Sequence, residues 1–346
     1  TTLTMSNISI IIPHHNNYDI LNDCLESLYK SNLHDSEIII VDNNTTDESI
    51  HKIKVDFPNL IIIKSATNRG YAGGCNYGAK HAKGNLLVFL NNDTEMEEQW
   101  LTQLITTINN DPNISSVQPK IINKYDKNKF DYAGGSGGFM DKYCYPFARG
   151  RIFHSIEKDN GQYDDSIKIF WASGTGFITK KKIFEQLGGF DETLFAHMEE
   201  IDYHWKCQLA GYHLHINPKS VIYHLGGGTL SYYSSYKTYL NHRNSLLLLL
   251  SNYNTLNTLK FLIPRIIMEH ISFFKDIITF RPNHAFAQIR ALLWIILHPY
   301  IIIKRRKKIK EIRLVDDKEL LNTTILNKSI VYQYFIKNKK IYSDLV

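Results

Sequence analysis

The stretch EIIIVDNNTTDES, residues 37–49, decides the fold class, because an unbroken apolar run ends there in carboxylate and amide side chains. Three similar runs, rich in isoleucine, leucine and valine, occupy residues 8–12, 60–63 and 86–90. Apolar runs without polar alternation are typical of strands that are covered on both faces of a sheet. We therefore expect these segments to form the buried strands of the N-terminal half.

Helical segments are predicted between these strands. Residues 18–30 (YDILNDCLESLYK) carry apolar side chains on one helical stripe, and residues 47–55 form a second, shorter helix. The alternation of strand and helix predicts an α/β sheet whose ligands gather at the carboxyl ends of its strands.

The pattern is less regular beyond residue 120. Residues 123–168 are rich in Gly, Tyr, Asp and Lys and predict loops or a small hairpin. Regular structure is expected again as a strand through Trp171, a short helix that stops at Gly188, a helix from Glu199 to Gly211, and a strand pair through His215 and His224.

Charge divides the chain near residue 230. Residues 1–230 carry 21 Lys and Arg against 27 Asp and Glu, whereas residues 231–346 carry 19 against 7. We expect an acidic globular domain followed by a mainly helical, basic C-terminal region. That region is predicted to contact an anionic membrane surface or a lipid-linked phosphate through its apolar segments 246–250, 261–280 and 291–303 and its basic cluster 304–310. A helical subdomain or an oligomer interface is the alternative for these segments.

The cellular compartment is inferred from three features. The uncharged residues 1–7 do not read as a secretory signal, and the apolar stretch 291–303 is shorter than the roughly 18 to 20 residues that span a bilayer. The four cysteines, Cys24, Cys75, Cys144 and Cys207, are far apart and form no CxxC pair, which fits a reducing environment. We expect a cytoplasmic protein that is soluble or peripheral on the inner face of the cell membrane.

Polar residues follow three of the predicted strands. Several strands that deliver carboxylates and amides to one edge of a sheet favour a nucleotide pocket, although each group alone is also ordinary turn or cap chemistry. The candidates are Pro13, His15 and Asn16 after the first run, Asp42 and Asn44 after the second, and Asn91, Asn92 and Asp93 after the fourth.

A glycine-rich run, ATNRGYAGGCNYGAKHAKGN, occupies residues 66–85 and opens a helical pattern. Its glycines allow a close backbone approach, and a helix N-terminus favours anions. Their spacing matches neither the dinucleotide-binding nor the P-loop motif. Arg69 is the candidate for a phosphate or base contact, with a surface arginine as the alternative.

Three carboxylates, Glu199, Glu200 and Asp202, crowd the start of a predicted helix. Their negative charges are favourable at the N-terminus of a helix, and one of them could also serve as a general base. His224 ends a strand and is followed by glycines, a position that is either structural or part of a site shared with Asp93.

Six motifs occur in a fixed order over residues 8–230: SIIIPHHNN, EIIIVDNNTTDES, NRGYAGGCNYGAKHAKG, LLVFLNNDT, WASGTGFITKKKIFEQLGGFDETLFAHMEEIDYHWKCQLAGY and SVIYHLGGGT. Together they resemble family 2 of the glycosyltransferases, in its rhamnosyltransferase-like branch of bacterial polysaccharide enzymes. The resemblance implies the GT-A fold, a Rossmann-like mixed sheet flanked by helices. It also implies a nucleotide-sugar half at about residues 1–120 and an acceptor half at about residues 121–230.

The resemblance also implies roles for the donor and metal residues. Asp42 would read the nucleobase, and Asp93 would bind the Mg²⁺ or Mn²⁺ ion that bridges the donor diphosphate. Asn91 stands where the family often has an acidic residue, so the chain departs from the Asp-x-Asp pattern. His224 would complete the metal shell, and Arg243 could contact the diphosphate.

On the acceptor side the resemblance makes Glu200 the general base that deprotonates the acceptor hydroxyl. Glu199 and Asp202 would orient it or touch the acceptor, and Trp171 would stack on a sugar. One base without a covalent intermediate implies inversion of configuration.

The expected function is therefore inverting, metal-dependent transfer of a sugar to a bacterial cell-surface glycan or a lipid-linked oligosaccharide. The branch suggests dTDP-rhamnose as the first donor to consider and a UDP-hexose as the second. No nucleic-acid partner is expected, and a homo-oligomer is possible. The alternatives are a nucleotidyltransferase, disfavoured because no Gly-rich, lysine-bearing loop follows the first strand, and a non-catalytic glycan-binding scaffold.

Overall fold

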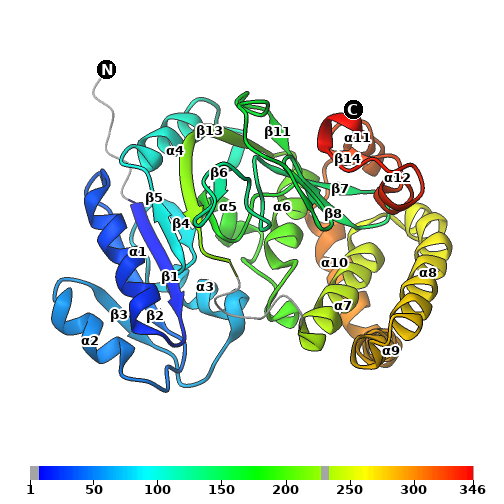
Figure 1. Cartoon of the computed structure of the whole chain (residues 1–346), viewed down its shortest axis with the longest axis horizontal. Coiled ribbons are helices and arrows are strands. Elements are labelled where there is room, and N and C mark those ends of the chain that lie inside the picture. The colour runs from blue at the N-terminus through cyan, green and yellow to red at the C-terminus, as the bar shows by residue number, and fades with distance from the viewer. Residues whose placement is uncertain (1–7, 227–233, 346) are drawn as a thin grey trace.

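A mixed β-sheet forms the centre of the protein in a computed structural model that describes residues 8–226 and 234–345 (Figure 1). β5 (Thr94–Met96) pairs with β13 at one side of this sheet. The other strands lie in the order β11 (Lys168–Ile169), β13 (His213–His224), β6 (Ile114–Asn123), β12 (Gly176–Lys180), β4 (Leu86–Leu90), β1 (Ile8–His14), β2 (Glu37–Asp42) and β3 (Ile61–Lys64).

The first four strands along the chain are parallel, as the apolar runs predict. β1 lies between β4 and β2, and β3 follows β2 at the edge. The register sets His14 at the end of β1 opposite Asp42 at the end of β2. The polar residues that follow these strands therefore meet at one edge of the sheet.

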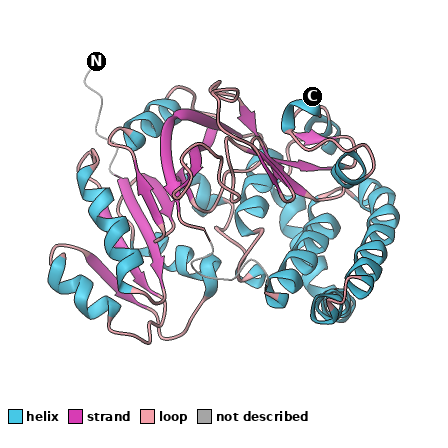
Figure 2. Cartoon of the chain, viewed as in Figure 1, coloured by secondary structure: helices cyan, strands magenta, loops and turns pink. Residues whose placement is uncertain are grey.

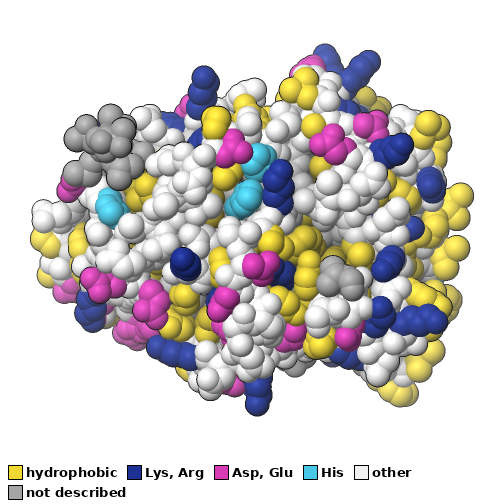
Figure 3. Space-filling view, turned by 90° about the horizontal axis from the view of Figure 1, so that it is seen from above, with side chains coloured by type: hydrophobic (Ala, Val, Ile, Leu, Met, Phe, Trp, Pro, Cys, Tyr) yellow, Lys and Arg dark blue, Asp and Glu magenta, His cyan; other side chains and the backbone are white. Residues whose placement is uncertain are grey.

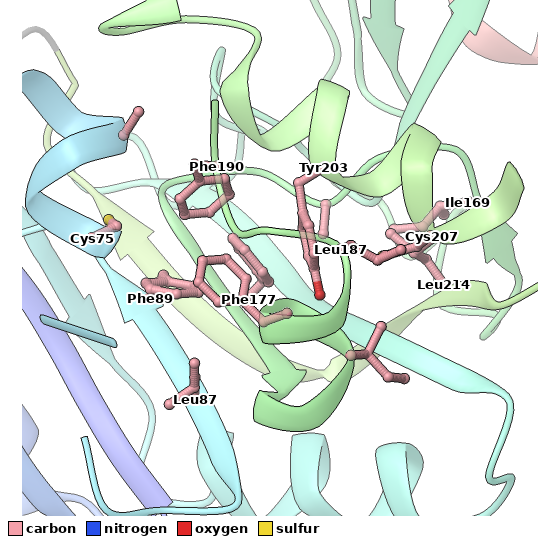
Figure 4. Close-up of a cluster of buried hydrophobic side chains, with 14 of the residues drawn as sticks. Cys75, Leu87, Phe89, Ile169, Phe177, Leu187, Phe190, Tyr203, Cys207 and Leu214 are labelled. Atoms are coloured by element: carbon pink, nitrogen blue, oxygen red, sulfur yellow. The ribbon is translucent and has the colours of Figure 1, made fainter. Parts of the chain in front are cut away.

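Alternate side chains of these strands enter two separate cores, one on each face. Ile10 and Ile12 pack under α1 (Tyr18–Lys30), α2 (Ser49–Asp56) and α4 (Trp100–Asn109), whereas Ile11 packs under α3 (Gly70–His81), α5 (Lys181–Gln186) and α6 (Glu199–Leu209). Figure 4 shows the second core, in which Phe89, Phe177, Phe190 and Tyr203 gather between α3 and α6. The predicted helix at residues 18–30 is confirmed.

Two sequence-based expectations for residues 121–224 need correction. The predicted strand pair through His215 and His224 is one strand, β13, whose pairing with β6 shifts register between Asn217 and Val221. Trp171 lies outside the strands and forms an isolated bridge to Gly138. The irregular segment folds as a small second sheet of β7 (Gly138–Asp141), β8 (Pro146–Ala148), β9 (Arg151–Ile152) and β10 (Ser155–Ile156).

The C-terminal region is mainly helical, as predicted, and its helices group at one end of the molecule (Figure 2). It also returns to the N-terminal part, because its strand β14 (Ile325–Leu326) pairs with β7. The proposed boundary near residue 230 lies outside the described residues. The helices are α7 (Ser235–Asn252), α8 (Thr255–Ile278), α9 (Pro282–Leu297), α10 (Pro299–Ile312), α11 (Asp317–Leu321) and α12 (Ile330–Phe335).

No single helix in the described ranges has the length and apolar character that crossing a bilayer requires. α9 and α10 satisfy the criterion only as a pair, and the chain bends by 69° between them. Leu246 to Leu249, which were expected to lie in a membrane interface, are instead buried, and Leu247 to Leu249 pack with α6, Tyr253 and Phe261. That part of the membrane prediction is wrong.

Candidate active site

Asn43 connects the loops at the carboxyl edge of the parallel strands. Its side-chain Nδ2 donates to the Gly70 carbonyl at 3.0 Å, and its Oδ1 accepts from the Arg69 backbone N–H at 2.9 Å. The loop after β2 is thereby fixed to the start of α3. Asn43 belongs to the polar group that follows the second strand, but its role as a link was not predicted, because an Asn after a strand looks like ordinary turn chemistry.

The predicted donor-binding residues line this edge. Asp42 is buried, and one of its oxygens accepts the Thr45 backbone N–H at 2.8 Å. Asn16 is exposed and holds Thr46, which ties the loops after β1 and β2 together. Of three further predicted residues, Pro13 lies near the end of β1, whereas His15 and Asn44 lie in the same loops. Asn44 is exposed and in the left-handed conformation (φ 63°).

A buried chain of hydrogen bonds holds Asn92 in the centre of the edge. Its Nδ2 lies 2.9 Å from Nδ1 of His14, and Nε2 of His14 lies 2.8 Å from Oγ of Ser49. Burial lowers the pKa of His14 to about 4, so the ring is neutral and can accept from Asn92 while donating to Ser49. Asn92 is thereby held in place by strand β1.

Arg69 lies beside this edge with a half-exposed guanidinium. Its Nε donates to Ser65 at 3.1 Å, and the group stacks on the Tyr77 ring at 5.2 Å. A terminal nitrogen stays 4.0 Å from the Glu192 carboxylate. This loose pairing leaves the guanidinium able to contact a phosphate.

Asp93, between β4 and β5, and His224, the last residue of β13, form a buried pair. The His224 Nε2 lies 3.3 Å from Oδ1 of Asp93, an oxygen that accepts no hydrogen bond. The other ring nitrogen, Nδ1, lies 2.8 Å from Oδ1 of Asp131. Burial acts to lower the pKa of His224, but the charges of Asp93 and Asp131 outweigh it and raise this pKa to about 10.

Asp131 is a residue that the sequence did not reveal. It lies in the irregular segment after β6, where no periodicity marks a site. A carboxylate on the far nitrogen of a histidine is the usual way to orient a metal-ligating imidazole. The side chain of Asn91 hydrogen-bonds the Asp93 carboxylate. Asn91 therefore supports the acidic residue of this site.

These residues fit a divalent cation bound with the donor. Oδ1 of Asp93 and Nε2 of His224 face each other at 3.3 Å, and both atoms can bind Mn²⁺ or Mg²⁺ once the imidazole has given up its Nε2 proton. Among the residues that the structure describes, no cluster of three or more His, Cys, Asp or Glu side chains could hold an ion alone. The remaining ligands of such a cation would therefore come from water and from the donor diphosphate.

Glu199 and Glu200 are the first two residues of α6. Glu199 is only 4% exposed, whereas Glu200 is half-buried and hydrogen-bonds the Gly174 backbone. Each carboxyl keeps one oxygen without a hydrogen-bond partner. Burial raises the pKa of both groups, and for Glu199 the charge of Glu200 raises it further. The geometry makes Glu200 the more accessible proton acceptor.

The loop before α6 is held in an uncommon backbone conformation. Phe195, His197 and Met198 have φ angles of 63°, 65° and 74°, in the left-handed region that non-glycine residues rarely adopt. Gly70 makes room for it, because a Cβ atom there would lie 2.4 Å from the Phe195 carbonyl oxygen. Such strain persists only where the surroundings impose the conformation.

Two side chains of α7, which we call the loop clamp, impose that conformation. Asn244 Nδ2 donates to the carbonyls of Leu194, Ala196 and His197 at 2.7–3.0 Å. Arg243 is buried, and its guanidinium donates to the Thr193 and Leu194 carbonyls at 3.0 Å. The prediction that Arg243 contacts the donor diphosphate is therefore not supported, because its guanidinium is occupied by the clamp.

Asn244→Ala is expected to lower the free energy of unfolding by about 2 kcal/mol, because the Ala196 and His197 carbonyls lose their side-chain donor, whereas the Leu194 carbonyl keeps Arg243. It should also lower kcat by up to ~10²-fold, since a small displacement of Glu200 is enough to misalign it. Steady-state kinetics beside a thermal melt measure both, with Asn241→Ala on the same helix as the control. An unchanged kcat in a destabilised Asn244→Ala protein would show that the clamp does not position the base.

Two predicted acceptor-binding residues are structural. Trp171 is 3% exposed, its indole N–H donates to the Phe139 carbonyl at 2.8 Å, and its ring lies against Gly138, so the predicted sugar stacking is wrong. Asp202 is fully buried and pairs with Lys206 at 2.6 Å and with Arg305 at 2.5 Å. Burial acts to raise the pKa of Asp202, but these two cations lower it to about 2. Asp202 therefore ties α10 to α6.

Comparison with known proteins gives the class of the chain. The sequence model described as "Glycosyl transferase family 2" matches residues 9–188, more than half of the chain. The chain therefore belongs to glycosyl transferase family 2 and is a glycosyltransferase.

Its relatives include the low-salt glycan biosynthesis hexosyltransferase Agl10 of Haloferax volcanii, which is 26% identical over 70% of this chain and 75% of that protein. The O-antigen biosynthesis protein RfbC of Myxococcus xanthus is 28% identical over 54% of this chain, but the chain spans only 14% of that protein. The mannosyltransferase PcManGT of Pyrobaculum calidifontis, solved with GDP-Man and Mn²⁺, matches 90% of this chain and 85% of its own at a TM-score of 0.53 and 13% identity. This similarity confirms the GT-A fold.

Proposed function

We propose that the protein is an inverting, metal-dependent glycosyltransferase that moves a sugar from a nucleotide diphosphate donor to an acceptor hydroxyl. The observation that carries the proposal is Glu200, a half-buried carboxylate with a raised pKa and a free oxygen at the start of α6. An enzyme that operates near neutral pH needs a base of this kind. The buried pair of Asp93 and His224 supplies the second half of the site.

The reaction is one in-line displacement at the anomeric carbon. Glu200 takes the proton of the acceptor hydroxyl, the acceptor oxygen forms its bond to the anomeric carbon, and the bond from that carbon to the diphosphate oxygen breaks. The bonding electrons leave with the diphosphate. A cation held by Asp93 and His224 would supply neutralising charge to that leaving group. Arg69, with its half-exposed guanidinium, is placed to bind a phosphate oxygen.

Glu199 supports Glu200 without replacing it. Burial and the neighbouring charge of Glu200 raise the pKa of Glu199, which favours its neutral form beside an ionised Glu200. A neutral Glu199 can donate a hydrogen bond within the site. With Glu200 acting as a base in one displacement, the product has the inverted configuration.

The donor and acceptor follow from the relatives and from the motifs. Agl10 is named as a hexosyltransferase of glycan biosynthesis, and RfbC is named for O-antigen biosynthesis. We therefore propose a cell-surface glycan or a lipid-linked oligosaccharide as the acceptor, reached from the cytoplasmic side of the membrane. dTDP-rhamnose is the first donor to test and UDP-hexoses are the second.

A donor panel tests the proposal. Purified protein is incubated with dTDP-rhamnose, UDP-glucose, UDP-galactose and GDP-mannose, with Mn²⁺, Mg²⁺ or chelator, and nucleoside diphosphate release is measured. Release from one donor that chelator abolishes is the expected result. A folded protein that binds glycan and releases diphosphate from none of these donors under any condition would instead be a scaffold.

A further inference from the structure

Helix α8 has the reverse of the side-chain distribution of an ordinary surface helix. Its inward side carries a fully buried ion pair, Arg265 with Glu269, whose atoms lie 2.8 Å apart. Arg265 also donates to the Ser245 hydroxyl at 2.6 Å and stacks on Tyr145. A helix of a water-soluble protein normally directs its apolar stripe inward and its charges outward. The apolar stripe of α8 must therefore lie on its outer side.

The outer side of α8 is an apolar ridge. Its residues repeat at intervals of three and four, the spacing of one helical face, and span about 30 Å. They are between 56% and 74% exposed. We define the α8 ridge as Leu259, Ile263, Ile267, Ile271, Phe274 and Ile278.

The exposed apolar surface continues beyond α8. Phe280, in the turn to α9, is 92% exposed, and Phe286, Leu293 and Ile296 on α9 are exposed as well. Figure 3 shows hydrophobic side chains along the edge of the molecule where α8 lies in Figure 1, with Lys and Arg side chains between them. A continuous exposed apolar surface of this kind marks a site of contact with a membrane or with another protein.

The charges around the ridge have one sign. Lys260, Lys275, Arg281 and Arg290 are exposed on α8, on α9 and in the turn that joins them, as are Lys304, Lys307 and Lys308 on α10. Across residues 255–310, all of which the structure describes, no acidic side chain is exposed: Glu269 is buried in its ion pair, and half-buried Asp276 accepts from Gln288. Apolar groups surrounded by cations match the surface of an anionic bilayer.

Two other arrangements fit less well. A membrane span is disfavoured because no single helix in the described ranges has the length and apolar character that crossing a bilayer requires. A symmetric contact between two copies would bring two sets of like charges together, and lysine is depleted in protein interfaces. Arg305 does not contribute to the membrane charge, because it is buried and pairs with Asp202.

From this pattern we propose that the α8 ridge and Phe280 lie in the headgroup region of an anionic membrane, with α8 parallel to the surface. The ridge is at one end of the molecule, and the sheet with its donor edge lies away from it (Figure 1). The basic side chains provide the preference for anionic lipid, and the ridge provides the insertion. The inference concerns a surface separate from the active site and holds whichever donor is used.

Flotation with vesicles tests the proposal. The full chain is mixed with vesicles of phosphatidylcholine alone or with 30% phosphatidylglycerol, at low and high salt. We expect binding to the anionic vesicles that high salt weakens. Ile263→Ser/Ile267→Ser/Ile271→Ser should reduce the bound fraction at least tenfold, because these exposed side chains insert. Val55→Ser/Tyr125→Ser, which removes exposed apolar groups elsewhere, is the matched control and should bind as the natural protein does.

Donor turnover with a water-soluble acceptor is measured in parallel and should not change in the triple variant, which shows that it is folded. Equal binding by the triple variant, or no binding of the natural protein to anionic vesicles, would overturn the proposal. Light scattering adds a third outcome. A dimer that the triple variant dissociates, together with no vesicle binding, would assign the ridge to a second copy of the chain.

Discussion

Asp93→Asn is expected to lower kcat/KM for the preferred donor by about 10³-fold, the effect of several kcal/mol of lost charge stabilisation at the leaving diphosphate. The substitution keeps the size of the side chain and removes its charge, so the cation loses its acidic protein ligand. The measurement is diphosphate release against Mn²⁺ concentration, and the variant should require far more Mn²⁺ than the natural protein.

Glu95→Gln is the matched control for this experiment. Glu95 lies two residues further along the chain, on β5, and pairs with Lys124 at 2.8 Å on the surface. Its neutralisation should leave turnover and metal dependence unchanged. Near-normal turnover by a folded Asp93→Asn protein with unchanged chelator sensitivity would contradict the assigned metal role.

Glu200→Gln should lower kcat by ~10²- to 10⁴-fold, the usual range for loss of a general base. The amide keeps the size and much of the hydrogen bonding, so donor binding should survive. Glu199→Gln is the internal control, because burial and the charge of Glu200 raise the pKa of Glu199 and favour its neutral form, which an amide resembles. That variant should stay within a few-fold of normal turnover. The reverse pattern would assign the base to Glu199.

The pH profile provides a second signature of Glu200. Burial raises its pKa to about 7, and only the ionised carboxylate, present above that pH, accepts a proton. kcat/KM should therefore fall with a slope of one as the pH drops below about 7. This decrease of kcat/KM at low pH should be absent in Glu200→Gln, because its residual turnover needs no ionised group at this position.

The strands and helices of the first half were predictable because each carries its own signal. Unbroken isoleucine runs mark β1 and β2, and the stripe of α1 is visible in thirteen consecutive residues. β13 was misjudged because Asn217 and Pro218 look like a turn, whereas its pairing with β6 is continued across a register shift there. The signal for that continuation lies in β6, a hundred residues earlier.

The site was predictable only where the chemistry is local. Asp93, His224 and Glu200 end strands or begin a helix, and the structure brings the first two together. The roles of Asp131 and Asn244 depend on contacts between segments far apart in the chain, so no local pattern reveals them. Trp171 was misassigned for the same reason.

The exposed face of α8 shows a related limit. Its composition suggested either a core or a membrane surface, and only the buried pair of Arg265 and Glu269 shows which side of the helix faces the protein. The neighbouring segment 246–250 is equally apolar, but Leu246 to Leu249 are buried in the core.

The anomeric configuration of the first product tests the central claim most directly. With the donor that the panel identifies, the product is followed by proton NMR during the first turnovers, before any spontaneous anomerisation. The account predicts a product inverted at the anomeric carbon, because Glu200 acts as a base in one displacement. A product that retains the donor configuration would require a covalent or ion-pair intermediate and would contradict it.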